Sequence, residues 1–117
     1  MPLMRAVQVS APGADFELVS KEIPEPKENE VLVKIEACGI CHGDAVTKEG
    51  RYPDIKYPRV PGHEVIGKID RLGSKVFSWK IGQRVGIGWY GGPCLKCKAC
   101  LRENLVAVKF FNSRNFL

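Results

Sequence analysis

Alternating hydrophobic and polar positions predict short β-strands along much of the chain. The clearest alternation spans residues 30–37, where one face would carry four apolar residues and the other two charged ones, namely Val31, Val33, Ile35 and Ala37 against Lys34 and Glu36. Residues 5–10 alternate more weakly, and residues 63–72 and 81–88 are further strand candidates. These patterns predict a chain that is mainly β.

Glycine and proline separate the strand candidates. Residues 22–30 contain two prolines and residues 51–61 contain three, so both stretches are predicted to be loops. Residues 39–50 leave room for one or two helical turns around Asp44–Lys48. The glycine-rich string 86–92 runs into cysteines and not into a helix, so it is not a dinucleotide fingerprint. Short strands joined in this way predict a barrel or a sandwich.

Composition narrows the class of protein. The 117 residues are enough for one domain, and 44% hydrophobic with 26% charged residues is typical of a globular protein in water. No apolar run approaches the roughly 20 residues of a membrane span, and the start of the chain has no signal-peptide core. We therefore expect a cytoplasmic protein without a membrane partner. The net charge of +5 is scattered among carboxylates, which argues against a nucleic-acid partner.

The cysteines are the residues that say most about the chemistry of this protein. All five cysteines lie in two clusters, Cys38 with Cys41 and Cys94 with Cys97 and Cys100. In a chain without an export signal, such spacing indicates metal or redox chemistry more than a disulfide framework. Three thiolates at intervals of three can wrap one zinc ion, which prefers four ligands, so one ligand is missing from the second cluster. Unliganded thiols, an iron–sulfur cluster and a redox dithiol are the alternatives.

The first cluster has further candidate ligands nearby. The segment Cys38–His42 ends in a histidine, Asp44 follows it, and the pair His63–Glu64 comes later in the chain. Taken alone, His63 is typical of a polar or core histidine and Glu64 of a surface carboxylate. Together with a cysteine pair they offer sulfur, nitrogen and oxygen ligands in a combination that suits zinc. Spacing does not decide which of the two cysteines and His42 would bind.

From residue 4 to residue 100 the chain resembles the catalytic domain of zinc-dependent medium-chain alcohol dehydrogenases. Five motifs in the same order carry the resemblance: Cys38–Asp44, Tyr57–Glu64, Val65–Gly67, Gly82–Gly86 and the triple cysteine. It implies a mainly β, GroES-like partial barrel with one or two short helices and a cysteine-rich zinc loop. The motifs look closest to the branch that includes cinnamyl-alcohol-type enzymes.

The resemblance implies roles for the residues of the first cluster. Cys41 and His63 match ligands of the catalytic zinc, and Glu64 matches a neighbouring acid that can ligate it. Asp44 matches an acid that orients the zinc histidine. His42 matches a position near the pyrophosphate of the cofactor.

The other cysteines also acquire roles from the resemblance. Cys38 matches a residue that is not a ligand. Cys94, Cys97 and Cys100 match three of the four ligands of a separate structural zinc. The fourth ligand is expected at Val108, whose side chain cannot bind a metal.

The activity that the resemblance implies is oxidation of an alcohol to an aldehyde or ketone, or the reverse reduction. Zinc acts as a Lewis acid, and hydride passes to or from NAD or NADP. The expected partner is therefore a small-molecule alcohol or aldehyde. Gly43 stands where the family usually has a serine or threonine that starts a proton relay, so a relay here would need water.

The resemblance also sets the expected domain organisation. Residues 1–105 are expected to form the GroES-like catalytic zinc domain and residues 106–117 an atypical tail. The family's nucleotide-binding domain has no counterpart in the sequence, so we expect a truncated chain that is inactive alone, binds no NAD or NADP, and can associate with a full-length homologue. The alternative functions are a non-catalytic zinc-binding module and a GroES-like interaction domain.

Overall fold

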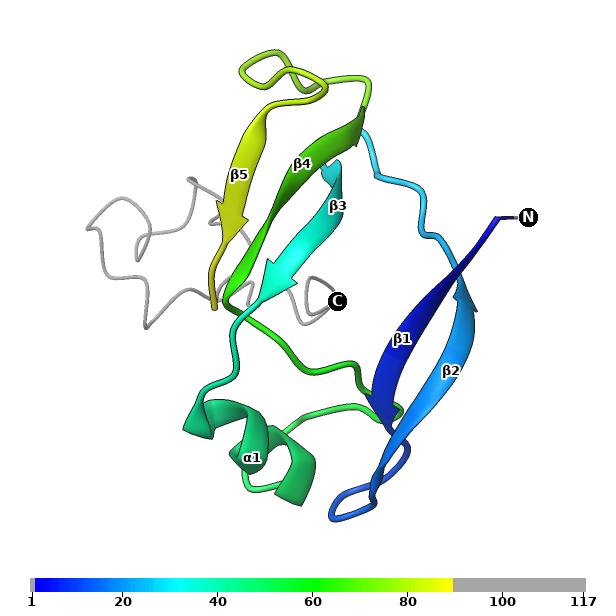
Figure 1. Ribbon diagram of the computed structural model, residues 1–117, viewed down its shortest axis with the longest axis vertical. Helices are drawn as coiled ribbons and strands as arrows, with labels where there is room; N and C mark the ends of the chain where they lie inside the picture. The colour runs from blue at the N-terminus through cyan, green and yellow to red at the C-terminus, as the bar shows by residue number, and fades with distance from the viewer. Residues whose placement is uncertain (1, 90–117) are drawn as a thin grey trace.

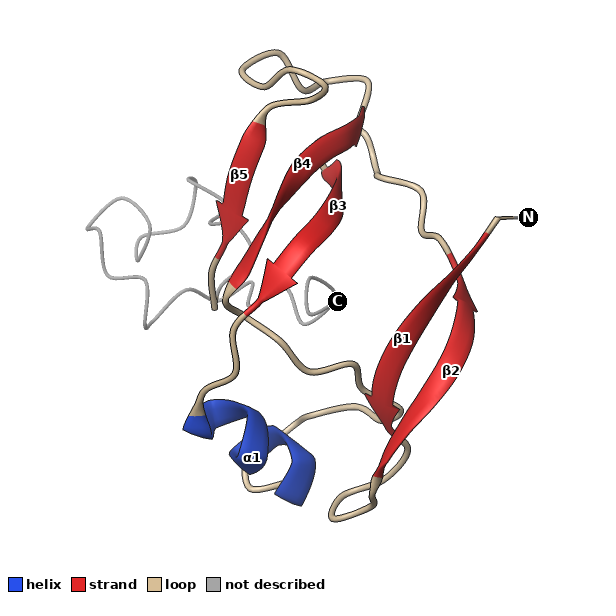
Figure 2. Ribbon diagram, viewed as in Figure 1, coloured by secondary structure: helices blue, strands red, loops and turns tan. Residues whose placement is uncertain are grey.

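Five strands and one helix make up the fold, as the computed structural model shows for the residues it describes, 2–89. Their order along the chain is β1 (Leu3–Val9), β2 (Phe16–Glu22), β3 (Val31–Cys38), α1 (His42–Glu49), β4 (Val65–Leu72) and β5 (Arg84–Ile87). Figure 1 shows the hairpin β1–β2 beside the sheet of β3, β4 and β5, with α1 at one end. Figure 2 shows how strongly strands outweigh helix, which confirms the predicted mainly β class with a short helix.

Backbone hydrogen bonds organise the strands into two antiparallel sheets. One contains β1 and β2, and the other has the order β3-β4-β5. Val9, at the end of β1, exchanges two backbone hydrogen bonds of 2.8 and 2.9 Å with Arg59. The hairpin is therefore tied to the segment that leads into β4, just before His63.

The core lies against the central strand β4. Val65, Gly67 and Ile69 are buried, whereas the residues between them are exposed, which is the alternation expected of a strand with one covered face. Ile69 is only 2% exposed. Leu32 and Val33 of β3 complete this part of the core, so the packing that supports the site centres on β3 and β4.

The predicted alternation in β3 is wrong in detail. Leu32 and Val33 are consecutive and both buried, while Ile35 and Ala37 are exposed. The register of β3 against β4 shifts between Leu32 and Val33 and again between Ile35 and Ala37. A bulge of this kind puts an extra residue in one strand and breaks the period of two.

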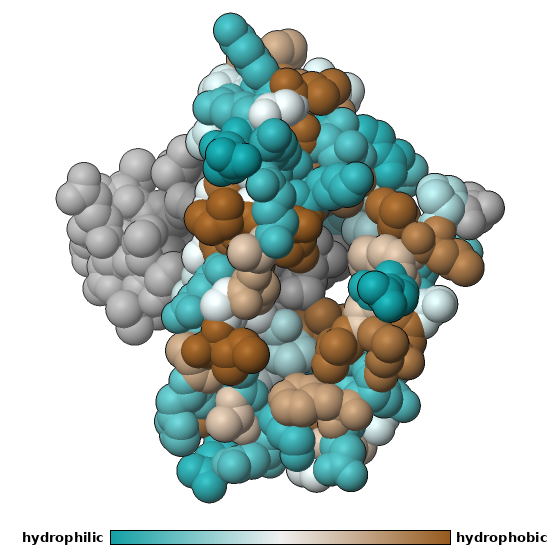
Figure 3. Space-filling model, in the orientation of Figure 1, coloured by the Kyte–Doolittle hydropathy of each residue, from teal (hydrophilic) through white to brown (hydrophobic). Residues whose placement is uncertain are grey.

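The hairpin exposes much of its apolar surface. Phe16 is 50% and Leu18 65% exposed on β2, and Leu3 and Val7 are exposed on β1. Figure 3 shows hydrophobic surface, coloured brown, on the side of the molecule formed by the hairpin. The ammonium group of Lys48 lies 5.6 Å from the centre of the Phe16 ring. The consecutive residues Leu18 and Val19 are both apolar, one exposed and the other half-buried, so β2 has no clear alternation and was not predicted from the sequence.

Both ends of α1 are capped by its own sequence. Cys41 is the N-cap, and its side chain together with that of Asp44 forms a capping box. At the other end Gly50 adopts a left-handed conformation with φ of 74°, and Lys48 lies in the last turn. The predicted helical turns around Asp44–Lys48 are therefore confirmed. The helix that residues 2–89 form has 8 residues, and this part of the chain contains no candidate membrane-spanning helix.

Replacing Gly50 by alanine should destabilise the fold by about 1–2 kcal/mol, because a side chain in the left-handed region is strained. A Cβ at this position would also lie 2.6 Å from the Cβ of Pro12. Gly13 is the matched control, since its φ is 78° but a Cβ there would meet nothing within 4 Å. Urea unfolding should show a larger loss for Gly50→Ala than for Gly13→Ala, and equal losses would contradict the packing argument.

An ion pair spans the sheet from β5 to β3. The Arg84 guanidinium donates to both carboxylate oxygens of Glu36, at 3.2 and 3.1 Å, which lowers the pKa of Glu36 and raises that of Arg84. A carboxylate whose pKa is lower in the folded than in the unfolded protein stabilises the fold when the pH is above the unfolded pKa. This stabilisation is lost as the pH falls through the pKa of the folded state. NMR titration should show the pKa of Glu36 rising towards its ordinary range in Arg84→Gln. An unchanged pKa would mean that the pair does not persist in solution.

Candidate metal centre

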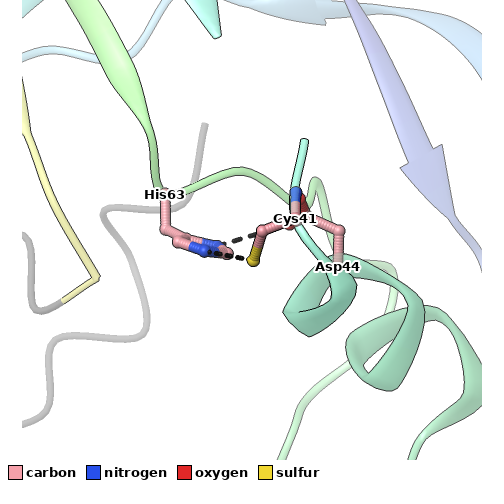
Figure 4. Close-up of side chains that lie close together, drawn as sticks. All are labelled: Cys41, Asp44 and His63. Atoms are coloured by element: carbon pink, nitrogen blue, oxygen red, sulfur yellow. Dashed lines mark hydrogen bonds and ion pairs between the residues drawn. The ribbon is translucent and has the colours of Figure 1, made fainter. Parts of the chain in front are cut away.

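Three side chains from separate parts of the chain converge beside α1. Cys41 lies just before the helix, Asp44 is in its first turn, and His63 lies in the segment that enters β4. One potential ligand atom from each residue lies within 4.8 Å of the other two. Figure 4 shows the His63 ring directed at the sulfur of Cys41, with Asp44 alongside. The site therefore depends on how the β3–α1 connection packs against the chain before β4.

The helix start orients the sulfur of Cys41. The backbone N–H of Gly43 donates to this sulfur at 3.2 Å, and the N–H of Cys41 donates to the Oδ2 atom of Asp44 at 3.1 Å. These two bonds satisfy amide groups that a helix N-terminus leaves without partners. A sulfur that faces an amide donor is well placed to act as a thiolate ligand.

The imidazole of His63 lies between the sulfur and the carboxylate. Its Nε2 atom is 2.9 Å from the sulfur of Cys41, and its Nδ1 atom is 3.4 Å from Oδ1 of Asp44. The side chains of His63 and Asp44 are only 10% and 11% exposed. A proton on Nδ1 would face the carboxylate, which leaves the Nε2 lone pair directed towards the sulfur.

Two aromatic residues beside the cluster were not predicted from the sequence. The Trp89 ring meets the His63 ring edge-on with centroids 4.4 Å apart, and Tyr52 packs on Trp89 at 5.6 Å. A Cβ at Gly43 would lie 3.0 Å from the Trp89 ring and 3.2 Å from the sulfur of Cys41. A side chain at Gly43 would therefore require the indole to shift slightly. The only sequence signal was an aromatic residue directly after the last strand candidate.

Several predicted site residues do not join the cluster. Glu64 is exposed, and its carboxylate lies over Gly39, where it would block a Cβ. His42 is exposed at the first position of α1, and Cys38 is exposed at the end of β3. The roles given to these side chains stay predictions. The remaining predicted ligands lie outside the described residues, together with the expected fourth position: Cys94, Cys97, Cys100 and Val108.

Comparison with known proteins identifies a family model and several curated relatives that match the chain. Residues 27–113 match the family described as "Alcohol dehydrogenase GroES-like domain". The alcohol dehydrogenase of Geobacillus stearothermophilus is 42% identical over 99 residues, which are 84% of this chain and 29% of the relative. Five curated relatives are matched over only 22–29% of their own length.

Solved structures are similar over nearly the whole chain. The benzyl alcohol dehydrogenase of Acinetobacter calcoaceticus has a TM-score of 0.85 and 36% identity, covering 99% of this chain and 31% of that one. The Helicobacter pylori enzyme described as "CAD", which was solved with NADP(H), has a TM-score of 0.78 and 28% identity, covering 90% and 30%. These likenesses confirm the GroES-like architecture predicted from the sequence.

Proposed function

Since the chain belongs to the family of alcohol dehydrogenase GroES-like domains, we propose that Cys41 and His63 hold the catalytic zinc ion of an alcohol dehydrogenase. The reaction would be oxidation of an alcohol to an aldehyde or ketone, or the reverse, with NAD or NADP as hydride carrier. The observation that carries the proposal is the convergence of a cysteine sulfur, an imidazole nitrogen and a buried carboxylate at one point of the fold.

The donor set fits zinc. Thiolate sulfur and imidazole nitrogen are preferred zinc ligands, and a carboxylate on the far ring nitrogen commonly orients a zinc histidine. Asp44 suits this orienting role better than direct ligation, since one of its oxygens accepts the Cys41 N–H and the other faces Nδ1 of His63. Catalytic zinc sites use three protein ligands and keep one position open. We propose Glu64 as an additional ligand, which requires its side chain to leave Gly39.

The chain's own residues prepare the site for this chemistry. A zinc ion bound here would polarise the oxygen of an alcohol or carbonyl substrate. Asp44 fixes the orientation and the tautomer of His63, so that Nε2 is free to bind metal. Trp89 packs against the same ring, with the two ring centroids 4.4 Å apart. Gly43 carries no hydroxyl, so the proton released from an alcohol would leave through water.

We propose that the cofactor is bound in part at His42. This side chain is exposed at the first position of α1 and matches the family position near the pyrophosphate. The related Helicobacter pylori structure was solved with NADP(H). Residues 1–117 alone are expected to bind zinc without turning over alcohol, because their sequence has no dinucleotide fingerprint. We also propose that the chain associates with a full-length homologue.

A hybrid enzyme tests the proposed function. In this hybrid, the present chain replaces the matching stretch of the Geobacillus stearothermophilus alcohol dehydrogenase. The hybrid should oxidise short or aromatic alcohols with NAD or NADP, and Cys41→Ser in the hybrid should abolish turnover. The non-catalytic zinc module is the competing function. A folded hybrid that retains zinc and yet shows no turnover would favour that module and contradict the proposal.

A further inference from the structure

We propose that Cys38 and Cys41 form a reversible disulfide that removes the sulfur of Cys41 from the metal centre. The pairing itself needs only the two thiols. Its effect on the metal rests on the proposed function, in which Cys41 is a zinc ligand. The pair Cys38 and Cys41 would therefore react with a peroxide, in addition to the binding of zinc by Cys41.

The two thiols differ in their surroundings. Cys38 ends β3, is exposed, and donates a hydrogen bond of 3.5 Å to the carbonyl of its own neighbour Gly39. The sulfur of Cys41 is half-buried and is held by the Gly43 amide and by His63. An oxidant in solution therefore reaches Cys38 first, while Cys41 lies three residues away as a second thiol.

The connection between the two cysteines allows them to approach. Gly39 and Ile40 have no regular secondary structure, and the Ile40 side chain is 88% exposed, so its movement disrupts no packing. Gly39 is anchored by a single backbone hydrogen bond to the carbonyl oxygen of Glu64. Two residues separate the cysteines, which is the spacing of the Cys-X-X-Cys motifs in which proteins form and reduce disulfides.

The oxidation proceeds in two balanced steps. Hydrogen peroxide transfers one oxygen to the thiol of Cys38, which forms a sulfenic acid and releases one water. The sulfur of Cys41 then attacks the sulfur of Cys38, the S–O bond breaks, and the thiol proton leaves with the hydroxyl group as a second water. Two thiols have lost two electrons and two protons, and the peroxide has accepted both. A dithiol reductant reverses the reaction by thiol–disulfide exchange.

Disulfide formation and metal binding compete for one sulfur atom. A metal site needs the thiolate form of cysteine, and a disulfide sulfur cannot supply it. Zinc bound at Cys41 should accordingly slow the oxidation, and oxidation should release zinc.

Peptide mapping provides the test. Trypsin releases residues 35–48 as one peptide, which contains Cys38 and Cys41 and none of the three cysteines of the second cluster. The metal-free 117-residue chain is treated with hydrogen peroxide, alkylated and digested. We expect peptide 35–48 to be lighter by two hydrogen atoms and unalkylated, and dithiothreitol should restore two alkylated cysteines. A peptide that stays doubly alkylated, carries oxygen on Cys38 alone, or is cross-linked to residues 94–100 overturns the proposal.

A second measurement follows zinc release in a chain whose Cys94, Cys97 and Cys100 are serine. Peroxide should release zinc about tenfold more slowly after Cys38→Ser, because Cys41 then lacks its partner thiol. Equal release rates would contradict the coupling of the disulfide to the metal. A chain that binds no zinc at all would instead refute the proposed function, and the peptide result on metal-free chain would still decide whether the disulfide forms.

Discussion

Cys41→Ser is expected to weaken zinc binding by more than about 100-fold, since even the loss of an outer hydrogen-bond partner of a zinc ligand costs 10–100-fold. The hydroxyl of serine is a poor substitute for a thiolate at a site built from sulfur and nitrogen. Serine is also a good helix N-cap, so it can still accept the Gly43 N–H and start α1. The variant therefore separates loss of the ligand from loss of the fold.

Competition with a chromophoric chelator measures this affinity, in a chain whose Cys94, Cys97 and Cys100 are serine so that their thiols contribute nothing. Cys38→Ser is the matched control, since Cys38 is exposed and does not belong to the cluster. Its zinc affinity should equal that of the parent. If both substitutions weaken binding equally, the assignment of Cys41 as the ligand is wrong. Circular dichroism verifies that both variants retain the fold.

Asp44→Ala should have the second largest effect, because this carboxylate supports both the helix and the histidine. It is 8% exposed, accepts the Cys41 N–H and faces Nδ1 of His63. Truncation leaves a helix amide without its partner, for a loss of about 1–3 kcal/mol in stability. Zinc affinity should fall about 10–100-fold as the histidine loses its orienting partner.

Asp44→Asn separates these two contributions. The amide oxygen of asparagine can still accept the Cys41 N–H, so most of the stability should remain, while the charge facing His63 is lost. Asp70→Asn on the exposed side of β4 is the control and should change neither quantity. If Asp44→Asn lowers stability as much as Asp44→Ala and leaves zinc affinity intact, Asp44 serves the helix alone.

The sequence predicted those parts of the fold whose residues follow a simple period. In β4, alternating residues are buried, and the strand could be identified from this pattern. In β3 the consecutive residues Leu32 and Val33 are both buried, next to a shift of register against β4, and no periodic rule anticipates this. The hairpin strand β2 was missed because the consecutive residues Leu18 and Val19 are both apolar, which leaves no clear alternation. Pairing across a hairpin is a property of two strands, and neither strand encodes it alone.

Prediction of the candidate site from the sequence needed a different kind of information. The first turn of α1 relates Cys41 to Asp44 by local geometry, which a helical pattern can suggest. No periodicity relates either residue to His63, which is 22 positions from Cys41 along the chain. Only the likeness to a known family linked them. Trp89 illustrates the remaining gap, because its contact with His63 follows from the path of the chain after β5.

X-ray absorption at the zinc edge identifies the ligands of the proposed metal centre, using the zinc-loaded chain whose Cys94, Cys97 and Cys100 are serine. We expect one sulfur at about 2.3 Å and imidazole nitrogen at about 2.0–2.1 Å from the zinc. The sulfur should disappear in Cys41→Ser and persist in Cys38→Ser, and the imidazole signal should disappear in His63→Ala. A zinc shell of oxygen atoms alone, or a sulfur that survives Cys41→Ser, would contradict the proposed centre.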